Sequence, residues 1–318
     1  MRLECEGCAG CCLDWRPLVP DGSDHERRGR REPLDDRYNF PQLSGREVRG
    51  FIDAGYGDAL TVRLFSPAEG DDAVCVDGHN LAAIRGRPVF LVGLRVAPKP
   101  VAPFDIDANV PDVDSPAAAG ADGSNAPGRT WLDACVFLDP ETLQCRIHGG
   151  EHYPETCSTY PGTNLRLGRE TECERVEDAF GGDRLLDDDP PDDAPNPFDP
   201  GALGGSVFAH PSPDALEGVI DRVVDGDPLR EHLVPFLSVA AGSAPGTLAV
   251  DDARVRQAGA TLREPDDCME SDGSWVGDTL SAWTERAGKP GTPVTESWAD
   301  FDRKYGAPAT PGWGRNDQ

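Results

Sequence analysis

Ten cysteines, eight of them in two blocks, constrain the fold of this chain more than any other sequence feature. The first block is the run CEGCAGCC at residues 5–12. The second block is more widely spaced and contains Cys135, Cys145, Cys157 and Cys173. In a reducing compartment, clustered cysteines indicate metal binding or redox chemistry before a disulfide framework. The spacing therefore predicts a fold organised around thiolates.

The run CEGCAGCC has a spacing that lets several thiolates converge on one centre. Its two glycines allow backbone amides to point at the sulfur atoms and ease their negative charge. Zinc binds four thiolates at about 2.3 Å, and a 4Fe–4S cluster also takes four. Cys5, Cys8 and Cys11 have the ferredoxin-like spacing. Adjacent side chains diverge, so we do not expect Cys11 and Cys12 to serve the same metal equally well, and one of them is expected to bind a second centre or to be structural.

The second block is expected to complete the centre, because the first supplies at most three well-placed ligands. Cys135 and Cys145 flank a predicted β-hairpin with Asp139-Pro140 as its turn. Cys157 lies in a short turn or helix start between two prolines. Closing a loop of about a hundred residues costs a few kcal/mol, which metal ligation can offset.

Short helices and strands are predicted between the blocks. Ser44-Gly45-Arg46-Glu47 has the pattern of a capping box, and Gly55 ends the helix that it opens. Strands are predicted at 61–65, 73–76 and 89–96 from their β-branched and aromatic content. Cys75 alternates with two valines and is expected to be a buried strand residue.

The predicted fold class is α+β: a small cysteine-cluster domain followed by an acidic, partly helical C-terminal region. The domain covers residues 1–186 and includes an acidic Pro/Ala/Gly-rich stretch near 105–130 that is expected to be a mobile loop. Residues 187–200 form an acidic, proline-rich linker. In 201–318, helices are expected from Ser212 onward and from about Leu229 to Ala240.

The amino-acid composition indicates the kind of solution in which the protein works. The chain has 57 acidic and 30 basic residues, and only Lys99, Lys289 and Lys304 are lysines, for a net charge of −27. Such a surface is typical of a halophilic protein, because salt near 1 M screens charges beyond roughly 3 Å. The same charge repels nucleic acid. No secretory signal is visible and no run approaches the ~20 apolar residues of a membrane span, so a cytoplasmic protein is expected.

Several motifs together resemble the YkgJ-type cysteine-cluster family of zinc- or iron-chelating domains. These are CEGCAGCC, the Ser/Thr-x-x-Glu helix start, C-V-F-L…C-R-I-H, P-E-T-C-S-T-Y-P and a last cysteine, over roughly residues 1–180. His148 stands where that family usually has tyrosine, and Tyr153 where arginine is usual. The resemblance implies zinc or an iron–sulfur cluster as cofactor. It carries over as metal ligands Cys5, Cys8, Cys11, Cys12, Cys135, Cys145, Cys157 and Cys173.

Three functions remain open at the level of sequence. The first is a metal-binding protein with zinc or an iron–sulfur centre. The second is an iron–sulfur-dependent methyltransferase, because flagellin lysine-N-methylases resemble the same cysteine-cluster family; no separate adenosylmethionine-binding motif is visible. The third is a thiol redox protein that cycles the vicinal pair Cys11 and Cys12. His148 and His152 are expected in surface or supporting roles, and the protein partner or substrate is undefined.

Overall fold

The computed structural model describes residues 11–14, 31–38, 40–96, 133–138, 145, 147–160, 162, 171, 202–225 and 228–263. These residues form an antiparallel sheet of five strands and a few helices, so the expected α+β class is confirmed. The predicted loop near 105–130 and the predicted linker 187–200 lie outside the described residues.

The sheet has the strand order β1-β4-β3-β2, with the short β5 paired to β4. β1 and β4 pair along five residues, from Leu60 opposite Leu94 to Leu64 opposite Phe90. The predicted strands at 61–65, 73–76 and 89–96 correspond to β1, β2 and β4. The strands are β1 (Leu60–Leu64), β2 (Asp72–Val76), β3 (His79–Ile84), β4 (Arg87–Leu94) and β5 (Phe208–Ala209).

β3 was not predicted, and two tight turns create it. Asp77-Gly78 joins β2 to β3, and Arg85-Gly86 joins β3 to β4. All four turn residues have positive φ, between 51° and 82°. This is the geometry of the two-residue hairpin turns whose twist matches that of the flanking strands.

Cys75 is exposed on β2, and the prediction that it is buried was wrong. β2 is the last strand in the order of the sheet. Val76 on the neighbouring position is buried and packs into the core. Because successive side chains of a strand point to opposite faces, Cys75 faces solvent.

The capping box at Ser44 forms as predicted and opens α1 (Gly45–Asp53). Ser44 Oγ accepts a hydrogen bond from the Glu47 amide at 3.3 Å, and Glu47 Oε2 accepts one from the Ser44 amide at 2.6 Å. Gly55 follows the helix with a φ of 79°, the left-handed conformation that glycine adopts readily. Phe51 and Ile52 are buried and form the inner face of α1.

Residues 202–263 are partly helical, as expected, but the first predicted helix is broken. Gly218, with a φ of 77°, separates a 3-10 turn from a short α-helix. Leu216, Ile220 and Val223 nevertheless share one buried face. The second predicted helix is present as α6, whereas α7 was not predicted. The elements are η4 (Pro213–Leu216), α5 (Ile220–Val224), α6 (Arg230–Gly242) and α7 (Asp252–Thr261).

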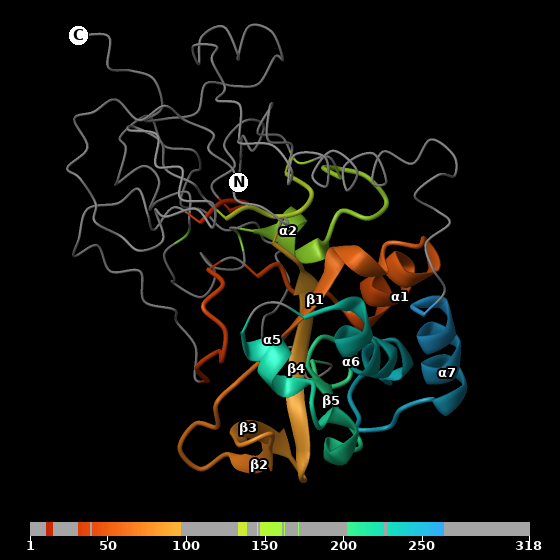
Figure 1. Ribbon diagram of the computed structural model, residues 1–318. Coiled ribbons are helices and arrows are strands. Elements are labelled where there is room, and N and C mark those ends of the chain that lie inside the picture. The colour runs from red at the N-terminus through yellow and green to blue at the C-terminus, as the bar shows by residue number, and fades with distance from the viewer. Residues whose placement is uncertain are drawn as a thin grey trace, which may run out of the picture.

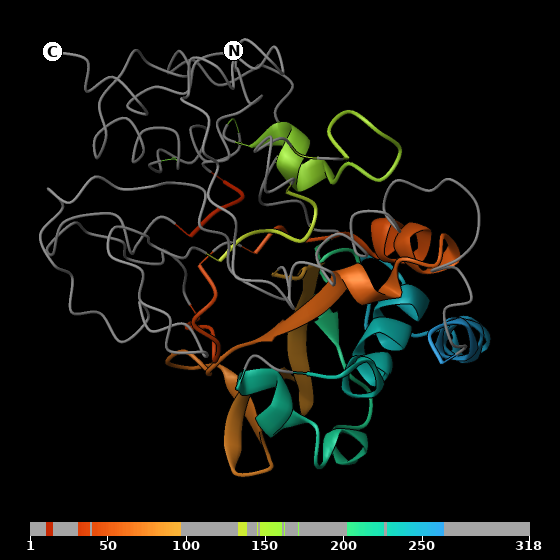
Figure 2. The same cartoon turned by 45° about the horizontal axis from the view of Figure 1, so that its top comes forward.

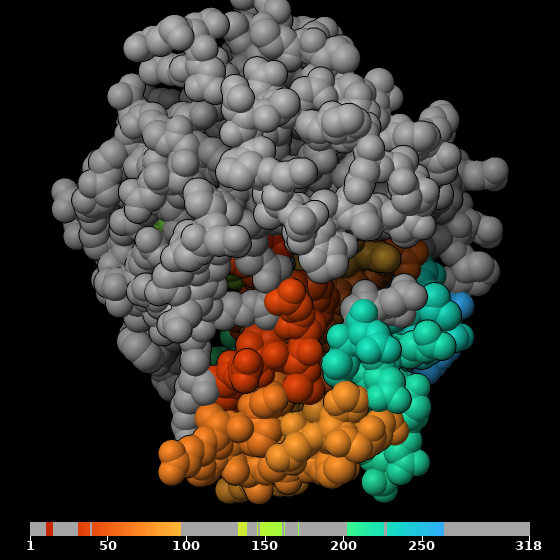
Figure 3. Space-filling model, turned by 60° about the vertical axis from the view of Figure 1, so that its left-hand side comes forward, coloured from red at the N-terminus to blue at the C-terminus, as the bar shows by residue number. Residues whose placement is uncertain are grey.

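One hydrophobic core joins these elements to the sheet. It extends along the chain from Leu13 to Leu262. Phe90 of β4 contacts the rings of Phe208 and Phe236 at centroid distances of 5.6 and 5.1 Å. α1, α6 and α7 lie together on one side of β1 and β4, and the β2–β3 hairpin lies at one end of the sheet (Figure 1). In the space-filling view, the orange hairpin adjoins the turquoise residues of the 213–224 segment (Figure 3).

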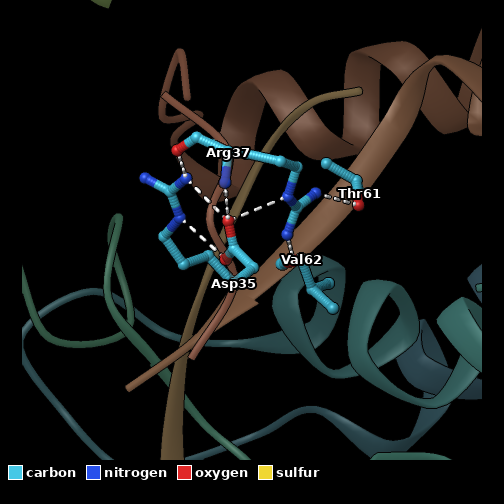
Figure 4. A network of polar contacts seen from close by, with 5 residues as sticks. Asp35, Arg37, Thr61 and Val62 are labelled. Carbon is cyan, nitrogen blue, oxygen red and sulfur yellow. Dashed lines mark hydrogen bonds and ion pairs between the residues drawn. The ribbon is translucent and has the colours of Figure 1, made fainter. Parts of the chain in front are cut away.

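A buried ion-pair network fixes the segment 31–38 against β1 (Figure 4). Arg63 donates to both oxygens of Asp35, from Nε at 3.0 Å and from Nη2 at 2.9 Å. Arg37 donates to the same carboxylate from Nε and from its amide, both at 3.0 Å. Its Nη1 and Nη2 reach Thr61 Oγ1 at 2.7 Å and the Val62 carbonyl at 2.6 Å.

Candidate metal centre

Five of the eight predicted ligands lie in the part of the chain that the structure describes. Cys12, Cys135 and Cys145 are partly buried and pack against the core. Cys11 and Cys157 are also only partly exposed, and all five are free thiols. The other three predicted ligands, Cys5, Cys8 and Cys173, lie outside the described residues.

Cys12 and Cys135 face each other across a short antiparallel pair. Leu13 is bridged to Ala134, and the Cys135 amide donates to the Cys12 carbonyl at 2.7 Å. Leu13 and Ala134 are buried in the core. Because side chains alternate along a strand, Cys12 and Cys135 lie on the opposite face of this pair from the two core residues.

The cysteine pair is attached to the end of β4. Cys135 is bridged to Val96 on the side opposite to the residue 12–14 segment, and the Val136 amide donates to the Arg95 carbonyl at 3.1 Å. The segment 133–136 therefore lies between the residues just after β4 and the segment 11–14. The end of β4 thus holds Cys12 of the first block beside Cys135 of the second.

Cys145 and Cys157 approach from the segment that follows. An isolated antiparallel bridge joins Leu138 to Cys145, so Cys145 lies opposite Leu138 rather than opposite Cys135. The predicted turn Asp139-Pro140 lies outside the described residues. Ile147 anchors the next residues in the core with 1% of its surface exposed. Cys157 is the third residue of α2 (Glu155–Thr159), and the hydroxyl of Tyr153 donates to its carbonyl at 3.3 Å. α2 lies at the end of the sheet away from the β2–β3 hairpin (Figure 2).

The thiols of these segments lie within electrostatic reach of one another. A hydrogen bond with Cys11 and then burial raise the pKa of Cys12 well above its ordinary value, and Cys135 and Cys145 raise it further. Burial raises the pKa of Cys157 in the same direction, with added contributions from Cys11, Cys135 and Cys145. Burial is also the main cause that raises the pKa of Cys135 to about 12 and that of Cys145 to about 11.

The five described cysteine thiols are suitable ligands for a thiophilic metal, although their side chains do not form a complete metal site. Among the described residues, no group of three or more His, Cys, Asp or Glu side chains has the geometry to hold a metal ion. Buried neighbouring thiols resist ionisation, and a bound cation would stabilise the thiolates. The residue types therefore fit zinc or iron better than hard cations, which prefer oxygen ligands.

Comparison with known proteins places the chain in a family. A family model matches residues 1–314, nearly the whole sequence. The chain belongs to DUF7531, a family of unknown function. No curated protein and no solved structure matched the chain.

The two histidines of this DUF7531 chain that lie near the cysteines make ring contacts. His152 packs against Phe51 and Tyr56 of the α1 region, with centroid distances of 5.5 and 5.3 Å. His148 is exposed and lies 4.9 Å from the ring of Tyr153.

Sequence reasoning missed two features beside the thiols in this DUF7531 chain. The first is a small hollow whose lining includes Cys12, Cys135, Asp14, Asp133 and Arg95. The alternation of a strand-like segment could have revealed Asp14, two residues after Cys12, as a neighbour of the thiols. The second is a contact from Glu47 to the start of α2, for which the sequence contains no signal.

Proposed function

We propose that this DUF7531 protein binds a metal through its cysteine thiolates, either as zinc or as an iron–sulfur centre. The observation that carries the proposal is the convergence of thiols from residues 11–12, 135–145 and 157 at one end of the sheet. Cys11, Cys135 and Cys145 lie within electrostatic reach of both Cys12 and Cys157, and four thiolates suffice for either kind of centre.

The protonation of these thiols favours a metal site over thiol redox chemistry. Reactive cysteines have a lowered pKa, because the thiolate is the nucleophile. Here burial and neighbouring thiols raise the pKa of Cys12, Cys135, Cys145 and Cys157. Such thiols ionise when a metal binds, and metal binding then stabilises the folded arrangement.

The resemblance to the YkgJ-type cysteine-cluster family supports the same function. It contributes three further candidate ligands, Cys5, Cys8 and Cys173, which would join the five described thiols. A cytoplasmic location in a salt-adapted cell belongs to the proposal: the described cysteines are free thiols, and the net charge is −27. Among the described residues, no helix has the length and apolar character needed to cross a bilayer.

Metal analysis of anaerobically purified protein in high salt tests the proposal. Brown protein with iron and sulfide indicates an iron–sulfur centre, and colourless protein with stoichiometric zinc indicates a zinc site. Cys135→Ser should lower the metal content, whereas Cys75→Ser, at an exposed position of β2, should leave it unchanged. Metal-free wild-type protein that cycles between dithiol and disulfide would instead establish the redox function.

A further inference from the structure

Glu47 uses both of its carboxylate oxygens, and each serves a different helix. Oε2 accepts from the amide of Ser44 at 2.6 Å and from its hydroxyl at 2.7 Å, which completes the cap of α1. Oε1 accepts from the amide of Glu155, the first residue of α2, at 2.7 Å. The side chain therefore joins two segments that are far apart in the sequence.

α2 depends on such outside contacts. It has five residues, and its N-cap Pro154 provides no side-chain acceptor for the first amides. Isolated helices of this length are unstable, because nucleation is costly. Glu47 satisfies one of the amides that a helix start leaves unpaired. A second tie comes from Thr156, whose hydroxyl donates to the Gln42 carbonyl at 2.7 Å.

The position of α2 determines where the Cys157 thiol lies. Cys157 is two residues beyond Glu155, on the same short helix. Its thiol is within electrostatic reach of Cys11, Cys135 and Cys145, and also of the Glu47 carboxylate. Releasing the start of α2 would therefore let Cys157 move away from the other thiols.

We propose that Glu47 is a positioning residue that holds α2 so that Cys157 joins the thiol site. The consequence for metal binding rests on the proposed function, whereas the consequence for the location of Cys157 does not. Without Glu47, the site should lose one of its thiolates while the fold of the sheet and α1 remains.

Three variants separate this role from an ordinary helix cap. Glu47→Ala removes the contacts to both helices. Ser44→Ala weakens the cap of α1 but leaves Glu47 Oε1 facing the Glu155 amide. Glu47→Gln keeps one acceptor oxygen and is the conservative rescue. The difference between the first two variants isolates the contact with α2.

The first measurement uses reduced, metal-free protein. A pulse of iodoacetamide is followed by mass spectrometry of the peptide that contains Cys157, with the exposed Cys75 as internal reference. In the Glu47→Ala variant, iodoacetamide should alkylate Cys157 about tenfold faster than in the wild type. The reason is that loss of a hydrogen bond to a charged group favours local opening. Ser44→Ala should remain close to wild type, and Glu47→Gln should fall between. Glu47→Gln also removes the carboxylate charge near Cys157 but keeps an acceptor, so it controls for the electrostatic effect on the thiol. Equal rates in Glu47→Ala and Glu47→Gln, or in Glu47→Ala and Ser44→Ala, would overturn the proposal.

The second measurement uses cobalt(II) as the metal probe. The sulfur-to-cobalt charge-transfer band should lose about a quarter of its intensity in Glu47→Ala if one of four thiolates is lost, and none in Ser44→Ala. An unchanged band in Glu47→Ala would contradict the positioning role. A wild-type protein without the band would count against the metal site itself and leave the alkylation rates to decide the role of Glu47.

Discussion

The buried carboxylate of Asp35 connects the segment 31–38 to β1. It pairs with Arg63 of β1 and with Arg37. The guanidinium of Arg63 also lies over the Phe40 ring, 4.5 Å from its centre. The segment 31–38 has no helix or named strand of its own, and this network adds to the bridge between Pro33 and Phe65 in holding it against β1.

Removing the charge of Asp35 should destabilise the protein strongly. Asp35→Asn leaves the Arg63 guanidinium buried without its anion, and breaking a buried pair costs about 3–5 kcal/mol. Asp58→Asn is the matched control, because its pair with Arg230 is more exposed and worth at most about 1 kcal/mol. Urea denaturation in high salt measures both free energies of unfolding. Equal losses for the two variants would show that the Asp35 network contributes no more than a surface pair.

The same carboxylate should make stability depend on pH. Burial favours the protonated form, but hydrogen bonds from Arg63 and Arg37 outweigh it and lower the pKa of Asp35. The folded state then binds fewer protons than the unfolded state, so the contribution is complete above the unfolded pKa of about 4 and is lost as the pH falls through the folded pKa. Urea midpoints from pH 6 down to pH 3 should fall less steeply in Asp35→Asn than in wild type.

At the scale of elements, the sequence identified features with a strong local signal. The capping box at Ser44 is a local signal, and it predicted the start of α1 correctly. β3 was missed although Asp77-Gly78 is a hairpin signal, because the flanking alternation is weak. The helix expected from Ser212 onward shows the converse case, because Gly218 with its positive φ interrupts it between η4 and α5.

Contacts between distant elements explain what the sequence could not predict at the site. Proximity of Cys12 to Cys135 follows from the pairing of both segments at the end of β4, which no local pattern encodes. The second contact of Glu47 depends on where α2 packs. The sequence groups the cysteines by spacing alone, and the pairing at the end of β4 determines how the segments of Cys12 and Cys135 meet.

Two glycines of different elements should respond oppositely to the same substitution. A Cβ at Gly93 of β4 would lie 2.6 Å from the Pro41 carbonyl oxygen and 2.7 Å from the Phe40 ring, so Gly93→Ala should cost about 1–3 kcal/mol. A Cβ at Gly50 of α1 would meet nothing within 4 Å. Gly50→Ala should therefore stabilise the protein by about 0.5–1 kcal/mol. Thermal unfolding of both variants in the same buffer tests this difference in sign.

At the scale of the whole molecule, residues 202–263 and residues 40–96 contribute to the same core. β5 pairs with β4, and α6 packs against α1 and β1. The rings of Phe90 and Phe236 meet nearly edge to face, at an interplanar angle of 72°. Elements that share a core in this way are expected to unfold together rather than as independent units.

A destabilising substitution in α6 should consequently destabilise the sheet as well. Phe236 is fully buried, so Phe236→Ala should lower the free energy of unfolding by about 3–5 kcal/mol. Leu229→Ala is the control from the same segment, because Leu229 is 58% exposed and should change stability little. Hydrogen exchange followed by mass spectrometry should show faster exchange of β1 and β4 amides in Phe236→Ala. If exchange accelerated only in α6 and α7, the two parts of the chain would be separate folding units that merely touch at Phe90.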